Sequence, residues 1–173
     1  MISLTEALEC DFAAKDMEHP HGDNEQALEL RLDAAEAFEE MGLYYDAAFS
    51  YDRAGKDAYY IRDEEERASC KLIARKYFLL VHQYLQDGVD IRQLTSYSGI
   101  EDSSRLRFRL LMDAAYAGGH AASALYACGY HRFARRMARR SADLFAQLGM
   151  MPRNKDVADA IARHVPDAFS RRE

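Results

Sequence analysis

The chain has 173 residues, of which 49% are hydrophobic, 9 are glycine and only 3 are proline. This length suits one globular domain, and the scarcity of turn-forming residues excludes a fold built from many short strands. The formal net charge of −6 and the sequence pI of about 5.5 do not favour nucleic acid as a partner. We therefore predict a single all-α domain over residues 1–173.

Capping residues and glycines divide this domain into a series of predicted helices. Ser3 begins a capping box, Asn24 and Asp63 are N-cap residues, and Gly42 ends a helix in the left-handed conformation. We expect helices over 3–18, 24–42, 44–60, 64–86, a short segment after residue 90, 103–117, 121–128, 130–148 and 155–164. The pair Gly118-Gly119 is expected to end the helix that precedes it.

Eight or nine helices with such short connections should lie antiparallel to their neighbours. The predicted domain then has core hairpins over 24–86, C-terminal helices with a basic face over 103–148, and a polar tail over 166–173.

The stretch 28–54 reads as a helical hairpin with small and aromatic residues at its packing positions. These residues are Ala34, Ala35, Phe38, Gly42 at the turn, Ala47, Tyr51 and Ala54. This pattern resembles the tetratricopeptide repeat, in which small residues let two helix backbones approach and aromatic residues fill the space between hairpins.

The chain also departs from the tetratricopeptide pattern. Arg31 stands where the family has tryptophan, and Tyr59 stands where it has proline. A weaker copy of the pattern near the C-terminus has its turn at Gly129, 87 residues after Gly42. This separation is not a multiple of the family's repeat length of about 34 residues. Together with the following segment to residue 86, the hairpin resembles the SNAP-like branch. The resemblance implies irregular hairpins stacked as a short α-solenoid, and a non-catalytic adaptor that docks a helix or peptide of another protein.

In that family, exposed residues of the first helix of each hairpin line the binding groove. The corresponding stripe here is acidic, with spacings of three and four residues that keep it on one helix face. We predict that it binds a basic protein or peptide through Glu29, Asp33, Glu36, Glu39 and Glu40. The alternative is an acidic face that is simply solvated.

Five arginines gather on one side of the predicted helix 130–148. They are Arg132, Arg135, Arg136, Arg139 and Arg140, and they span about 140° of a helical wheel. Guanidinium groups bind phosphates and carboxylates well, so this basic face predicts an anionic partner. Three alternatives are solvation, pairing with the acidic half of the same chain, and contact with the acidic groove of a second copy. Residues 1–100 carry 10 Lys and Arg against 21 Asp and Glu, whereas residues 101–173 carry 13 against 8.

No catalytic residues, cofactor or metal site are predicted. His19 and His21 lie in a loop interrupted by Pro20, which does not favour a metal site. Cys10, Cys70 and Cys128 are few and widely spaced, which favours reduced thiols and a cytoplasmic location. A helical ligand-binding sensor or an enzyme with an unrecognised pocket, for instance near His82, is the alternative function. A regulatory protein that binds an anionic partner through the arginines is another.

Overall fold

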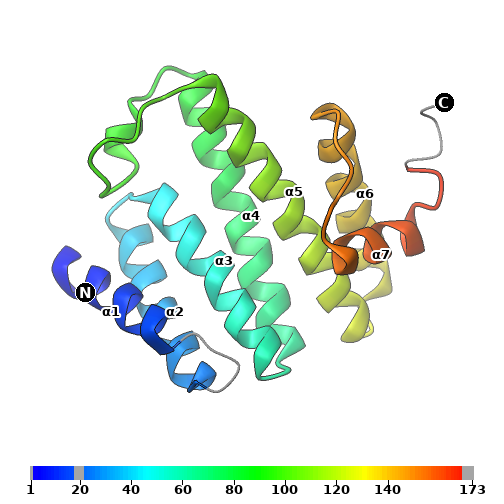
Figure 1. The fold of residues 1–173 in the computed structure, drawn as a ribbon, viewed down its shortest axis with the longest axis horizontal. Coiled ribbons are helices and arrows are strands. Elements are labelled where there is room, and N and C mark those ends of the chain that lie inside the picture. The colour runs from blue at the N-terminus through cyan, green and yellow to red at the C-terminus, as the bar shows by residue number, and fades with distance from the viewer. Residues whose placement is uncertain (1, 18–21, 169–173) are drawn as a thin grey trace.

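The structure, a computed structural model, describes residues 2–17 and 22–168, and within them every regular element is a helix. The elements are α1 (Leu4–Met17), α2 (Asn24–Glu40), α3 (Tyr44–Tyr60), α4 (Glu64–Gln86), the 3-10 helix η1 (Ile91–Gln93), α5 (Ser104–Ala127), α6 (His131–Gln147) and α7 (Lys155–His164). Each α-helix from α1 to α6 packs against the next, and α7 packs on α5 and α6. Consequently α1 and α7 lie at opposite ends of the stack (Figure 1). The all-α prediction is confirmed.

Short turns reverse the chain between consecutive helices. Gly42 has a φ of 76°, which a glycine adopts at no steric cost, and the amide of Leu43 then donates to the carbonyl of Phe38 at 2.8 Å. The turn between α5 and α6 is built in the same way around Gly129, whose φ is 83°. At the start of α2 the capping side chain is that of Asp23, which accepts from the amide of Gln26, so the prediction of Asn24 as N-cap is off by one residue.

The expected count of eight or nine helices included the short segment after residue 90, and the described residues contain seven α-helices and one 3-10 helix at that place. Gly118 and Gly119 do not end a helix, because α5 continues through them to Ala127. Both glycines are buried where other elements approach closely. A Cβ on Gly119 would lie 2.3 Å from Cγ1 of Val157 on α7, and a Cβ on Gly118 would lie 3.2 Å from the Arg75 side chain on α4. These glycines therefore serve packing rather than chain reversal.

The core of the hairpin α2–α3 contains the small and aromatic residues that the sequence pattern predicts. Ala34, Ala47 and Ala54 are fully buried, and Phe38 and Tyr51 are nearly so. The ring of Tyr51 stacks on that of Tyr77 in α4 with centroids 6.2 Å apart. The hairpin α2–α3 thus packs through its aromatic residues onto the helix that follows it.

Arg31 is the unexpected member of this core. Its side chain is fully buried, its Nε lies 2.6 Å from Oδ2 of Asp57 on α3, and its Nη1 lies 3.5 Å from Oδ1 of Asp11 on α1. A buried charge persists only when it is paired in this way. The residue that departs from the repeat pattern therefore joins α1, α2 and α3 through charge instead of through an indole ring.

The contact between Gly119 and Val157 gives a prediction for stability. We expect Gly119→Ala to lower the free energy of unfolding by about 1–3 kcal/mol, because the added methyl group overlaps Val157. This loss should appear despite the gain of about 1 kcal/mol that alanine normally brings to a helix. Urea unfolding followed by circular dichroism measures it.

Two controls make the result specific. In a Val157→Ala background the Gly119→Ala penalty should shrink, since the overlapping methyl groups are gone. At Gly118 the same change meets only a flexible arginine side chain and should cost less. A Gly119→Ala protein as stable as the parent chain would contradict the close-packing account.

Candidate functional site

A pocket with a volume of about 400 Å³ lies between α3 and α5, with α4 as its floor. Asn154 and Asp156, at the start of α7, line one end of it. Its lining combines charged groups of both signs with tyrosine rings: Asp52, Arg53, Gly55, Lys56, Tyr59, Tyr60, Arg67, Lys71, Asp113, Tyr116, His120, Asn154 and Asp156. We refer to this pocket as the α3–α5 groove.

Helical spacing explains why these side chains converge. On α5, Asp113, Tyr116 and His120 follow one another at three and four residues, so they share one face of the helix. On α4, Arg67 and Lys71 are four residues apart and point to the same side. Because α4 runs antiparallel between them, α3 and α5 run in the same direction, and Tyr59 on α3 and His120 on α5 contact the same residue of α4, Arg67.

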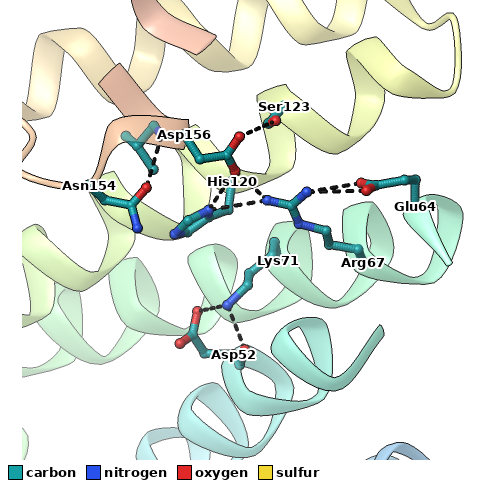
Figure 2. A network of polar contacts seen from close by, with 9 residues as sticks. Asp52, Glu64, Arg67, Lys71, His120, Ser123, Asn154 and Asp156 are labelled. Atoms are coloured by element: carbon teal, nitrogen blue, oxygen red, sulfur yellow. Dashed lines mark hydrogen bonds and ion pairs between the residues drawn. The ribbon is translucent and has the colours of Figure 1, made fainter. Parts of the chain in front are cut away.

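At the end nearest α7, the groove is organised by Arg67 (Figure 2). Its guanidinium lies 3.0 Å from a carboxylate oxygen of Glu64 and 2.5 Å from Oδ2 of Asp156 on α7. The side chain is only 5% exposed, and it also lies over the ring of Tyr59, 4.6 Å from its centroid. Arg67 therefore connects α4, α3 and α7 at one point.

Asp156 receives three polar contacts at the same place (Figure 2). Besides Arg67, Ser123 donates to its Oδ1 at 2.9 Å, and Nδ1 of His120 lies 3.3 Å from its Oδ2. The hydrogen bond with His120, together with those from Arg67 and Ser123, holds the pKa of this carboxyl well below its usual range. Asn154, which caps α7 by accepting from the amide of Val157, fixes the helix end from which Asp156 projects.

In the middle of the groove, Lys71 is held against α3. Its Nζ donates to Oδ1 of Asp52 at 2.7 Å and to the carbonyl of the same residue at 2.6 Å. The lysine stem crosses the helix at Gly55, where a Cβ would lie 3.0 Å from the lysine carbons. The glycine inside α3 thus makes room for a cation that would otherwise be displaced.

The end of the groove away from α7 contains a carboxylate in a different situation. Asp113 is 22% exposed at its side chain, and its Oδ2 is buried without a hydrogen-bond partner among the described residues. The nearest cation is Arg109, whose Nε lies 3.6 Å away. The pKa of Asp113 is raised to about 6, mainly by burial and in addition by the charge of Asp52, against the lowering effect of Arg109.

The predicted acidic residues lie on α2, outside this groove. Glu29, Asp33, Glu36 and Glu40 are exposed, and Glu39 is half-buried and accepts a hydrogen bond from the hydroxyl of Tyr51 at 3.2 Å. None of them lines the α3–α5 groove. Their role in binding a basic partner stays a prediction.

The five predicted arginines of α6 are all exposed, as the sequence indicated. Arg132, Arg135, Arg136, Arg139 and Arg140 form no ion pair with any residue of 2–17 or 22–168. Pairing with the acidic half of the same chain therefore has no support within these ranges. Tyr130 and Phe133 beside them are 50% and 60% exposed.

Sequence reasoning missed the groove residues Arg67, Lys71 and Asp113. The available signal was the glycine at 55 and the glycine pair at 118 and 119, since glycine inside a helix marks a close approach of another element. His82, considered for a pocket, is half-buried on α4 and does not line the groove.

The predicted loop histidines at 19 and 21 lie outside the described residues. Within the described ranges no three His, Cys, Asp or Glu side chains are arranged to hold a metal ion. No helix in those ranges is both long and apolar enough to cross a membrane.

Comparisons with known proteins give no match, whether to a protein-family model, to a curated protein or to a solved structure. The geometry of the groove and of the exposed faces is therefore the basis on which a function is proposed.

Asp113 gives a prediction for pH-dependent stability. Its pKa rises from 3.8 to about 6 on folding, so the folded state holds the proton more tightly than the unfolded state. The stability that this adds is present in acid and is lost as the pH rises through about 6. We expect Asp113→Asn, which keeps the neutral shape, to raise the free energy of unfolding by about 1–3 kcal/mol at a pH of about 7.5 and to change it little at about 4.

Urea unfolding at both pH values measures this difference. The exposed Asp159, which pairs with Lys155 on α7 and does not line the groove, provides the matched control Asp159→Asn. An Asp113→Asn protein that is less stable than the parent chain at both pH values would contradict the assignment of Asp113 as a strained, desolvated carboxylate.

Proposed function

We propose that the chain is a non-catalytic protein-interaction module that docks a peptide or helix of a partner protein in the α3–α5 groove. The observation that carries this proposal is the groove itself, in which Tyr59, Tyr60 and Tyr116 surround hydrogen-bonding groups from four segments of the chain. Tyr59 and Tyr60 are 52% and 48% exposed. Tyrosine supplies a large contact area and a polar group together, and it is enriched at protein interfaces.

The state of the charged groups favours recognition over catalysis. Lys71 is bound twice by Asp52, and His120 is engaged by Arg67 and Asp156. Such contacts fix the side chains before any partner arrives, which reduces the ordering cost of binding. The lining that the structure describes for the groove also contains no serine, threonine or cysteine that could act as a nucleophile.

The resemblance of residues 28–54 to the tetratricopeptide repeat supports the same class of function. On this proposal the chain is a short, irregular α-solenoid of cytoplasmic adaptor type, with the SNAP-like branch as its model. The groove then differs from the family pattern, because the second helices α3 and α5 line it together with the first helix α4. Fold likeness alone does not fix a function, so the groove residues carry the argument.

The arginine face of α6 supports a second contact with an acidic surface of the partner. Five exposed guanidinium groups without an ion pair among the described residues, next to exposed Tyr130 and Phe133, are a combination that protein interfaces favour. A second copy of the chain, with its exposed acidic α2 stripe, is one such surface.

A small-molecule sensor is the second candidate function. A volume of about 400 Å³ falls in the range of ligand pockets, and Asp113 has a strongly perturbed pKa. A ligand that binds only the folded state raises the melting temperature, so a thermal-shift screen with metabolites tests this candidate.

Affinity capture from the source cell tests the docking proposal. We expect Tyr60→Ser to reduce recovery of the bound protein by about tenfold or more, because an exposed aromatic anchor of the groove is removed. The matched control is Phe12→Ser, which alters an aromatic residue on α1 that is 64% exposed and lies outside the groove. Equal recovery with the Tyr60→Ser and Phe12→Ser proteins would contradict the proposal.

A further inference from the structure

The three carboxylates that line the groove differ in what they contact. Asp52 accepts from Lys71, and Asp156 contacts Arg67, His120 and Ser123. Asp113, in contrast, has a buried Oδ2 without a hydrogen-bond partner among the described residues, and its ion pair there is with the exposed Arg109 on its own helix, 3.6 Å away. A largely buried carboxylate whose nearest donor lies beyond hydrogen-bond distance is costly, so a further donor at this end of the groove would stabilise it.

The cations around this position are already engaged. Lys71 is held by Asp52, Arg53 lies 3.0 Å from Asp11, and Arg67 is shared by Glu64 and Asp156. An incoming anion would have to compete with these internal carboxylates. An incoming cation with N–H groups would bind Asp113 without separating Lys71, Arg53 or Arg67 from their carboxylates, and it would share Asp113 with the exposed Arg109.

We propose that the Asp113 end of the α3–α5 groove binds a cationic N–H group, the guanidinium or ammonium of a basic side chain of the docked segment. This inference rests on the proposed function of the groove, and it names the chemistry of the docked residue. Asp113 accepts the hydrogen bonds of the cation, and the stem of the basic side chain lies in the part of the groove lined by Tyr116. The destabilising effect of Asp113 in the free protein is then the consequence of keeping a carboxylate ready for this contact.

Binding should depend on pH because the carboxylate must be ionised. The groups whose charge acts on Asp113 are Arg109 on its own helix and Asp52 on α3, and Tyr45 on α3 also interacts with it; Arg53, Lys56 and Lys71 line the same groove. Protonation of Asp113 below about pH 6 removes the acceptor charge and weakens the contact, and the bound cation lowers the pKa of Asp113 in return.

The test uses free argininamide and lysinamide as probes for the full chain, with citrullinamide as an uncharged isostere of argininamide. The side-chain carboxyl resonance of Asp113 and the backbone amide resonances of Asp113 and Tyr116 report the binding. Each probe is titrated to about 100 mM, at a pH of about 7.5 and again at about 5. A single charged side chain in a preformed site is expected to bind with a Kd of about 1–10 mM. Asp113→Asn is the test variant, and Asp159→Asn is the matched control.

We expect the cationic probes to shift these resonances saturably at the higher pH, and citrullinamide to bind about tenfold more weakly or not at all. Asp113→Asn should weaken argininamide binding by about tenfold while Asp159→Asn leaves it unchanged. No saturable shift, equal binding of argininamide and citrullinamide, or equal binding by the Asp113→Asn protein would overturn the inference. If Tyr60→Ser loses the captured partner while the cationic probes fail, the docking proposal stands and the cation assignment falls.

Discussion

The contact between Arg67 and Asp156 is the interaction on which the groove depends. Arg67 projects from α4 and Asp156 from the start of α7, so this ion pair holds two segments separated by 89 residues in sequence. His120 on α5 and Tyr59 on α3 pack around the same guanidinium. Without this junction α7 would be held only by its packing on α5 and α6 and by the contacts of Asp156 with His120 and Ser123 on α5.

Buried charge has a wider role in this small helical protein. Arg31 joins α1, α2 and α3, whereas Lys71 joins α3 and α4, and each cation is matched by carboxylates at short distance. Replacing such pairs with apolar residues is often neutral or stabilising. The pairs therefore determine how the helices are placed relative to one another more than they add to the free energy of unfolding. Asp113 is the exception, because its nearest cation is Arg109, which is itself exposed and lies 3.6 Å away. Because of this difference, Asp113 is the groove side chain that says most about the chemistry of a bound group.

The sequence was sufficient for the helical class, for most helix boundaries and for the packing of residues 28–54. Local signals decide these features: Gly42 and Gly129 adopt the left-handed conformation that ends a helix, and Asp63 caps α4. The groove could not be predicted, since Arg67 meets Asp156 only after α7 folds back on α5. Gly118 and Gly119 show the same limit. Glycine inside a helix can mean either a break or a close approach, and Val157, which decides between them, is 38 residues away from Gly119.

The central claim is that the partner docks between α3 and α5. The most direct measurement is site-specific photo-crosslinking in the source cell, with benzoylphenylalanine placed in turn at Tyr60 in the groove, at Glu36 on α2 and at Arg136 on α6. The account predicts a crosslinked adduct of one defined mass from position 60, because that ring borders the groove and is 48% exposed. Adducts from positions 36 and 136 with none from position 60 would contradict it and would move the binding site to the acidic or basic face.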